Sequence, residues 1–457
     1  MNGKRILLST LLIFLFLFVL SADYSHLLKY ETFTLDNGLQ VYLVPKSDLP
    51  LVSIWLASKT GAYTQTKDTF GYVHIFEHMF FKANKNMKTA EEYYETLKHL
   101  GIYYNGYTSQ EYVVYYYTFP EYLLEPAAKL AHDSIVYTAL DPAELEREKK
   151  VIEEEYNIRI SDPEYYLVNK LMAQALYQDQ LFRFDPLGEL DTIRSASIEK
   201  LAEIKENFFI PKNSAIFLVG NIDIEKTKTL VSQLFSDWKG KEPVKIAVEP
   251  VKSLDKDVVV FNYMNNPYIA KMYIMLNGPG NSDPEGKKLG YAADVLLASL
   301  SNQNHPFSKE MLKYVYNFDF YYDTCQFDGP IIFSAQLPVN QVASAYNTFK
   351  KCWNKVVNDR SYWDNSYIEQ AKQSYAISQI KLNQYKDLET IGHVVSRLWC
   401  LNMFPEALDL YYAYNEIKRE DIAVFIDKYF KGKHWVAGIL INKAKSNSFG
   451  YEKLLQP

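Results

Sequence analysis

Two histidines and a glutamate stand at a spacing that could bind and use a metal ion. The segment His74-Ile-Phe-Glu77-His78 has the pattern HxxEH, and on a helix the positions i, i+3 and i+4 lie on one face. The neighbouring residues are apolar, which predicts a buried helix. Buried imidazoles and a carboxylate need a partner that offsets their desolvation, and two histidines favour zinc. A hydrogen-bonded pair of core histidines is the alternative.

A second helix, expected over residues 145–160, offers a third ligand. Its predicted apolar face consists of Leu145, Val151, Ile152, Tyr156 and Ile158. Glu148 and Glu155 fall near the centre of that face, whereas Glu153 and Glu154 point towards solvent. Because carboxylates on a core-facing stripe are best explained by a cation, we predict Glu155 as a metal ligand and Glu148 as a residue that supports a ligand. For Glu148, an ordinary buried ion pair is the alternative.

The elements that must position these residues occur twice along the chain. In the first copy we expect strands at 39–44, 51–56, 102–108 and 112–119, with helices opening at Gly71 and spanning 89–100 and 123–137. The second copy repeats this order: Gly290 follows Gly71 by 219 positions and Pro338 follows Pro120 by 218. A nearly constant offset with matching elements indicates a duplication. The expected fold class is α+β, with two tandem αβ domains, each a mixed, mostly antiparallel sheet packed against helices.

The expected domain boundaries follow from this repeat. We predict a signal peptide at 1–22, a metal-bearing domain at 23–240, a charged linker at 241–256, and a second domain at 257–457. At the same offset, Ala293, Leu296 and Leu297 replace the HxxEH residues, so the second copy is expected to bind no metal.

Composition and the first residues restrict the class of protein. The 457-residue chain has a net charge of −6, which argues against nucleic acid as a partner. Lys4 and Arg5 precede an apolar run from Ile6 to Leu20, which is typical of an export signal and predicts a periplasmic or secreted protein. An uncleaved signal anchor is the alternative, and no other membrane contact is expected. Three cysteines are an odd number, so at least one thiol is free or pairs between chains.

The motifs together resemble the inverzincin zinc peptidases, the family of pitrilysin, insulysin and the mitochondrial processing peptidase. The resemblance rests on HxxEH, on Glu155 lying 77 positions after His78, and on the segments Asp36-Asn-Gly-Leu39, Asn105-Gly-Tyr-Thr108, Asp185-Pro-Leu-Gly188 and Ile210-Pro-Lys-Asn213. It implies a half-clamshell fold and one Zn²⁺ per chain, bound by His74, His78 and Glu155. It also implies Glu77 as the general base and Asn105, Gly106 and Tyr107 as a strand that binds peptide substrates.

Two departures from the family pattern concern partners. The family builds a closed chamber from four such domains, whereas this chain has two, so the resemblance implies a homodimer or a heterodimer with a related chain. The family's second half often carries a substrate-gripping Arg and Tyr, but residues 305–358 contain no Arg. The predicted function is therefore a zinc endopeptidase that works with a partner chain. The alternatives are a non-catalytic scaffold or peptide-binding subunit, and a zinc hydrolase with another substrate.

Overall fold

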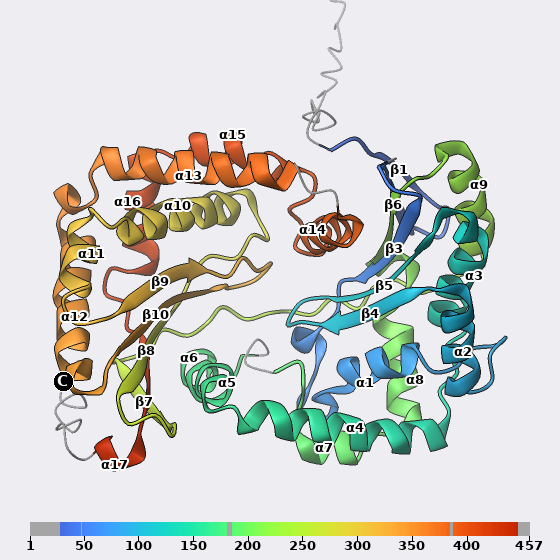
Figure 1. The fold of residues 1–457 in the computed structure, drawn as a ribbon, viewed down its shortest axis with the longest axis horizontal. Helices are drawn as coiled ribbons and strands as arrows, with labels where there is room; N and C mark the ends of the chain where they lie inside the picture. Colours follow the sequence, from blue (N-terminus) through green and yellow to red (C-terminus); the bar gives the residue numbers. More distant parts are fainter. Residues whose placement is uncertain (1–27, 47, 181–184, 384–386, 447–457) are drawn as a thin grey trace, which may run out of the picture.

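Two β-sheets, one in each half of the chain, carry the fold (Figure 1). The computed structural model describes residues 28–446 apart from 47, 181–184 and 384–386. The predicted signal peptide, residues 1–22, lies outside the described residues. Each sheet contains one parallel strand pair, and its other strand pairs are antiparallel. Helices cover both sheets, so the predicted α+β class is confirmed.

The first sheet has the strand order β1-β2-β6-β3-β5-β4. Its strands are β1 (Glu31–Thr34), β2 (Gln40–Pro45), β3 (Leu51–Ser58), β4 (Tyr103–Thr108), β5 (Val113–Pro120) and β6 (Ser214–Gly220). β2 and β6 are parallel, and β4 forms an edge because it pairs only with β5 among the described strands.

The second sheet repeats this arrangement without an equivalent of β1. Its strands are β7 (Val258–Tyr263), β8 (Ile269–Asn277), β9 (Asn317–Tyr322), β10 (Pro330–Pro338) and β11 (Val436–Ile441). The order β7-β11-β8-β10-β9 matches β2-β6-β3-β5-β4 strand for strand, and the parallel pair falls at the same place. The topology therefore agrees with the duplication inferred from the sequence.

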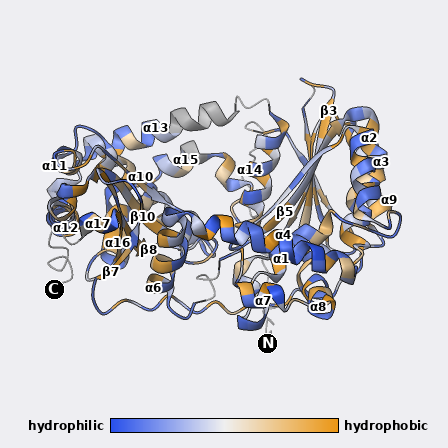
Figure 2. Cartoon of the chain, turned by 60° about the horizontal axis from the view of Figure 1, so that its bottom comes forward, coloured by the Kyte–Doolittle hydropathy of each residue, from blue (hydrophilic) through white to orange (hydrophobic). Residues whose placement is uncertain are grey.

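Helices cover both faces of each sheet. The longer helices of the first half are α1 (Tyr72–Phe80), α2 (Ala90–Leu100), α3 (Leu124–Val136), α4 (Pro142–Ser161), α8 (Ile198–Phe208) and α9 (Ile224–Phe235). Those of the second half are α10 (Pro284–Ser301), α12 (Val342–Asn358), α13 (Asn365–Asn383), α14 (Leu388–Cys400) and α16 (Arg419–Tyr429). Figure 2 shows hydrophobic colour along the strands and mixed colour on the helices, as expected for amphipathic helices on a buried sheet.

Each half lends a helical segment to the sheet of the other half. α14, from the second half, packs on the first sheet, where Val395 and Trp399 join a buried cluster with Trp55 and Phe217. In return, the segment formed by α5 (Pro163–Tyr165), a π-helical turn (Tyr166–Met172) and α6 (Ala173–Tyr177) packs on the second sheet. Gly392 and Gly438 lie at these two contacts, because a Cβ would collide with Trp55 and with Met172 respectively. Apolar burial at both contacts fixes how the two halves sit together.

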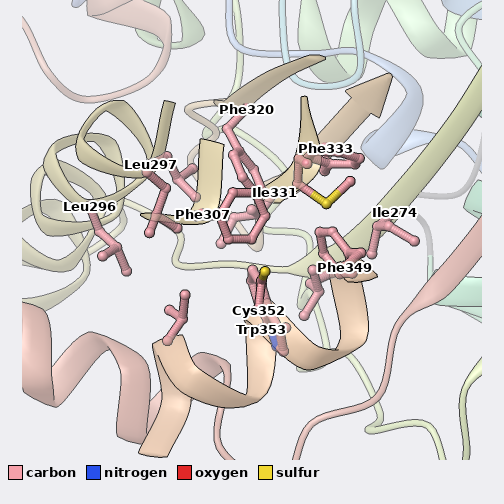
Figure 3. Close-up of a cluster of buried hydrophobic side chains, with 14 of the residues drawn as sticks. Ile274, Leu296, Leu297, Phe307, Phe320, Ile331, Phe333, Phe349, Cys352 and Trp353 are labelled. Carbon is pink, nitrogen blue, oxygen red and sulfur yellow. The ribbon is translucent and has the colours of Figure 1, made fainter. Parts of the chain in front are cut away.

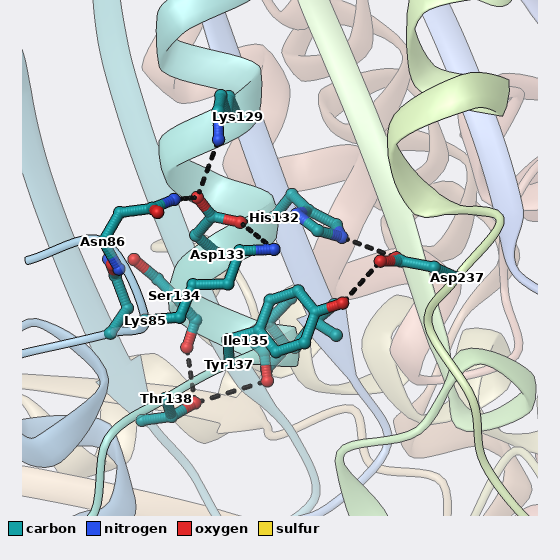
Figure 4. A network of polar contacts seen from close by, with 12 residues as sticks. Lys85, Asn86, Lys129, His132, Asp133, Ser134, Ile135, Tyr137, Thr138 and Asp237 are labelled. Atoms are coloured by element: carbon teal, nitrogen blue, oxygen red, sulfur yellow. Dashed lines mark hydrogen bonds and ion pairs between the residues drawn. The ribbon is translucent and has the colours of Figure 1, made fainter.

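A polar network also ties α3 to its surroundings in the first half (Figure 4). The ring of His132 bridges two carboxylates, with Nδ1 2.9 Å from Asp133 Oδ1 and Nε2 2.8 Å from Asp237 Oδ1. Tyr137 donates its hydroxyl hydrogen to Asp237 over 2.6 Å, and Lys129 lies 3.3 Å from Asp133. These contacts satisfy buried polar groups and join α3 to the end of α9.

Two sequence predictions about helices are wrong in detail. α10 begins at Pro284, not at Gly290, because Asp283 caps the helix by accepting a hydrogen bond from the Gly286 amide at 2.8 Å. On α4, Val151 and Ile158 are 49% and 70% exposed, so they do not belong to the apolar face. The buried face of α4 is narrower than predicted, because its buried residues are Glu144, Leu145, Glu148, Ile152 and Tyr156.

Two further observations bear on class and chemistry. Among the described helices, none is both long and apolar enough to cross a bilayer. Cys325, Cys352 and Cys400 are all buried as free thiols.

Candidate metal centre

Helix α1 carries the HxxEH motif and is held tightly against the rest of the first half. Gly71 precedes it with a φ of 89°, and a Cβ there would lie 2.9 Å from the Leu187 carbonyl oxygen, so only glycine fits easily. The Gly71 amide donates to Gln65 Oε1 at 2.6 Å, which fixes the start of the helix. The apolar residues of α1 are fully buried, and His74 is only 7% exposed. The motif therefore sits on a rigid element at the rim of the core.

The three predicted metal ligands come together, two from α1 and one from α4. His74 Nε2 and His78 Nε2 each lie 3.7 Å from Glu155 Oε2, and the three donor groups lie within 4.8 Å of one another. A tetrahedral zinc ion places its donors about 3.3 Å apart, so a small contraction would complete the site. Two imidazoles, one carboxylate and an adjoining pocket are the donor set and the open position of a catalytic zinc site. The residues present therefore fit Zn²⁺.

His78 is oriented from behind by Glu148. Its Nδ1 lies 2.9 Å from Glu148 Oε2, while Lys82 Nζ lies 2.8 Å from Glu148 Oε1. A carboxylate at Nδ1 holds the proton there and leaves Nε2 free to bind a metal. Burial lowers the pKa of His78, but the contacts with Glu148 and Glu155 outweigh it and raise the pKa to about 9. Metal binding at this ring must therefore displace a proton.

Unlike His78, both His74 and Glu155 favour the deprotonated form. Burial, together with the charge of His78, lowers the pKa of His74 to about 3, so its ring stays neutral. Pairing with His78 lowers the pKa of Glu155 to about 2, which keeps this carboxylate ionised. Arg159 Nη2 lies 3.1 Å from the second oxygen of Glu155. A neutral imidazole and an ionised carboxylate are the forms that bind metals.

Glu77 lies on the same stripe of α1, beside the three donors. Burial raises its pKa to about 7, and the hydroxyl of Thr108 donates a hydrogen bond to Oε2 at 2.6 Å. A carboxylate with a pKa near neutrality can both accept and return a proton.

The edge strand β4 forms one wall of a pocket of about 460 Å³ that also contains these groups. Asn105, Gly106 and Tyr107, which the resemblance gave as a substrate-binding strand, border this pocket. A Cβ on Gly106 would lie 3.0 Å from Phe81 and 3.3 Å from Glu77, so glycine lets the strand approach the carboxylate. The hydroxyl of Tyr107 instead contacts His393 of α14 at 2.9 Å, because alternate residues of a strand face opposite ways.

Three residues of the site lie outside the sequence-based set. Thr108 positions Glu77, Lys82 pairs with Glu148, and Arg159 pairs with Glu155. The spacing contained signals for all three. Thr108 shares strand parity with Gly106, Arg159 stands four positions after Glu155 on α4, and Lys82 stands four positions after His78, just past the end of α1.

Comparison with known proteins agrees with this fold and gives the family of the chain. The family model described as Insulinase (Peptidase family M16) matches residues 41–184, and the model described as Peptidase M16 inactive domain matches residues 195–375. The chain belongs to the insulinase family of peptidases, family M16, which confirms the resemblance found in the sequence.

Several relatives in this family are described as zinc proteases. Zinc protease PqqE of Helicobacter pylori is 25% identical over 53% of this chain and 52% of its own length. YmxG of Bacillus subtilis, described as an uncharacterized zinc protease, is 28% identical over 46% of this chain and 51% of its own. The beta subunit of the mitochondrial-processing peptidase of Neurospora crassa is 27% identical over 48% of this chain and 46% of its own. The chain thus spans about half the length of the curated relatives it matches.

Solved structures share the fold over nearly the whole chain. A protease from Helicobacter pylori superposes with a TM-score of 0.76 at 18% identity, covering 90% of this chain and 99% of that one. The first half of the periplasmic protease PqqL from Escherichia coli gives 0.76 at 18% identity, covering 92% and 93%. These likenesses establish the half-clamshell fold.

Proposed function

We propose that this chain is a zinc-dependent endopeptidase that cleaves peptides or unfolded polypeptide segments in a chamber formed with a partner chain. One observation carries the proposal: three metal-donor groups, the carboxylate of Glu77 and the edge strand β4 line the same pocket. On this proposal, residues 23–240 form the metal-bearing domain, 241–256 the linker and 257–457 a domain without metal ligands.

His74, His78 and Glu155 would hold one Zn²⁺ per chain, and Glu148 would orient His78. A zinc ion held there supplies a Lewis acid that activates water and polarises a carbonyl group. Burial alone would raise the pKa of Glu148, but the contacts with His78 and Lys82 lower it, so Glu148 stays ionised and continues to accept the Nδ1 hydrogen of His78.

A peptide substrate would add to β4 as an extra antiparallel or parallel strand. The backbone groups of Asn105–Tyr107 would pair with the peptide, and the absence of a side chain at Gly106 lets the peptide backbone pass close to Glu77. Because only an extended chain can pair in this way, folded proteins would be poor substrates.

Glu77 would act as the general base and then as the general acid. It accepts a proton from the attacking water, and it returns that proton to the nitrogen of the leaving amine. Thr108 holds one oxygen of Glu77 in place, and Glu77 lines the pocket.

A partner chain completes the chamber in this proposal. The whole PqqL protease of Escherichia coli matches this chain over only 48% of its own length, with a TM-score of 0.77, and the first half of that protein matches over 93% of its length. Here a second copy, or a related chain, would take the place of the remaining length. The basic and apolar segment at residues 4–20 supports export, to the periplasm or the exterior.

The test compares the wild type with Glu77→Gln for bound zinc and for cleavage of a quenched peptide library. We expect the wild type to bind zinc and cleave, and Glu77→Gln to keep the zinc and lose cleavage. Glu154→Gln, an exposed carboxylate on α4, is the matched control and should behave as wild type. A scaffold or peptide-binding subunit would bind peptides with no cleavage in either protein, and cleavage by Glu77→Gln would refute the assigned base.

A further inference from the structure

A second pocket, of about 230 Å³, lies in the other half of the chain between α10 and α14. None of the metal-centre residues lines it. Three tyrosine rings form part of its walls: Tyr291 from α10, Tyr322 from the end of β9, and Tyr414 from α15 (Leu410–Asn415). We call it the Asp294 pocket, after the one acidic side chain that lines it.

Among the described residues, the carboxylate of Asp294 has one hydrogen bond and no cationic partner. Its Oδ2 accepts from the hydroxyl of Tyr414 at 2.9 Å, and no Lys, Arg or His among the described residues forms an ion pair with it. Burial raises the pKa of Asp294 to about 7, which means that the enclosed charge is not compensated by the protein.

The two cations that line the pocket are already paired with other acids. Lys287 Nζ lies 3.3 Å from Glu406, and Arg397 Nη2 lies 3.6 Å from Asp323 and 3.3 Å from the Thr324 carbonyl oxygen. Paired cations do not neutralise Asp294. The charge that the pocket lacks is therefore positive.

The tyrosine rings are fixed in place. Tyr414 packs edge-on against Tyr291, with ring centroids 5.2 Å apart, and stacks on Tyr375 at 4.1 Å. Tyr322 donates its hydroxyl hydrogen to the Pro279 carbonyl oxygen at 2.6 Å, and a Cβ on Gly290 would already lie 3.1 Å from its ring. Rigid aromatic faces beside a carboxylate are the arrangement that proteins use to recognise ammonium groups.

We propose that the Asp294 pocket binds the ammonium group of a small organic amine. Asp294 supplies the negative charge, and the rings of Tyr291, Tyr322 and Tyr414 enclose the rest of the ligand. Leu398 and Arg397 place α14 on the other side of the pocket, and α14 also packs on the first sheet. A bound amine would therefore contact the element that joins the two halves. The ammonium could belong to a free amine or to the N-terminus of a peptide.

The test measures binding of phenethylammonium and of its neutral analogue phenethyl alcohol to the full chain by calorimetry. We expect the ammonium to bind at least about tenfold more tightly than the alcohol, because only the ammonium pairs with the carboxylate. Asp294→Asn keeps a polar partner for Tyr414 and removes the charge, so it should lower ammonium affinity at least about tenfold. Asp427→Asn, an exposed acid that pairs with Lys431, is the matched control and should leave affinity unchanged.

A second pair of variants tests the aromatic wall. Tyr291→Leu should weaken phenethylammonium binding, whereas Tyr122→Leu, at a tyrosine that is 79% exposed in the first half, should not. A peptide with a free N-terminus and the same peptide acetylated distinguish the two sources of ammonium. Equal affinity for ammonium and alcohol, unchanged affinity in Asp294→Asn, or no binding at about 10 mM would overturn the proposal. These readouts do not involve zinc or cleavage, so the result is independent of the proposed peptidase activity.

Discussion

Helices α1 and α10 occupy equivalent places in the two halves, yet they use those places differently. Where α1 has His74, Glu77 and His78, α10 has Ala293, Leu296 and Leu297, each at most 1% exposed. Figure 3 shows Leu296 and Leu297 in an apolar cluster with Phe320 and Phe333. The same helix position thus points to a polar pocket in one half and to a hydrophobic core in the other.

The neighbouring edge strands differ in the same sense. Gly106 of β4 pairs with Tyr115, and Phe320 of β9 pairs with Phe333, which lies 218 positions after Tyr115. The second half therefore places a phenylalanine ring where the first half has no side chain. A metal pocket needs open space between β4 and α1, whereas the side chains between β9 and α10 fill a densely packed core. One architecture can thus carry either a site or a larger core.

The largest expected effects come from changing equivalent positions of α1 and α10, where one change should affect catalysis and the other stability. Glu77→Gln should lower kcat by about 10²–10⁴-fold without lowering the free energy of unfolding, because a buried carboxylate is replaced by a neutral side chain of the same shape. At the equivalent position, Leu296→Ala should lower the free energy of unfolding by about 2–5 kcal/mol. Zinc affinity should not change in Leu296→Ala. Peptide cleavage, zinc titration and denaturant unfolding of both variants check this; a large loss of stability in Glu77→Gln would break the comparison.

Zinc binding distinguishes two neighbouring carboxylates of α4. Glu155→Gln should weaken zinc binding by more than about 100-fold, since it removes one of three protein donors. Glu154→Gln removes an exposed charge one position away and should change the affinity little. Chelator competition measures both. If Glu154→Gln loses more zinc, the helical phase that places Glu155 at the site is incorrect.

Removing the carboxylate that orients His78 should weaken zinc binding less than removing the ligand Glu155. Glu148→Gln should weaken zinc binding by about 10–100-fold, because a neutral amide fixes the His78 ring less strongly. Glu146→Gln, on the same helix and exposed, serves as the control. Equal affinity in Glu148→Gln and the wild type would reduce Glu148 to an ordinary ion pair with Lys82.

Filling the gap at Gly106 should make the first half more like the second. Gly106→Val brings a Cβ within 3.3 Å of Glu77 and adds two methyl groups. We expect kcat to fall by about tenfold with zinc retained, because Glu77 and the peptide backbone are moved apart. Steady-state kinetics and metal analysis test this, and an unchanged kcat would argue against substrate pairing along β4.

A separate effect concerns the pH dependence of stability in the second half. Burial raises the pKa of Asp294 from its ordinary value to about 7, so between these values the folded state binds more protons than the unfolded state. Stability from this group therefore falls as pH rises, by at most about 1.4 kcal/mol per pH unit. Asp294→Asn should abolish this contribution. The free energy of unfolding of the variant, relative to that of the wild type, should therefore increase from pH 5 to pH 8. Denaturant unfolding of both proteins at pH 5 and pH 8 measures this. An equal difference in the free energy of unfolding at the two pH values would disprove the prediction.

Local patterns in the sequence predicted much of this structure. The HxxEH spacing located the stripe of α1, the helical period selected Glu155 over Glu154 for the pocket, and the offset of about 219 residues matched the repeated strand order. These features depend on residues that are near one another on one element.

Features that depend on contacts between distant segments could not be predicted. The exchange of α14 and α6 between the sheets, the turning of Tyr107 towards His393, and the Asp294 pocket each join residues far apart in the chain. The exposure of Val151 and Ile158 belongs with them, because it depends on which faces of α4 the other elements of the fold cover.

Zinc stoichiometry tests the central claim most directly. Metal analysis of the purified chain should find one zinc per chain in the wild type and in Glu77→Gln, and almost none in His74→Ala. Leu296→Gln, at the position equivalent to Glu77, should gain no second zinc. A wild-type chain that binds no zinc under saturating conditions, or a His74→Ala variant that keeps a full equivalent, would contradict the assignment of this pocket as the metal centre.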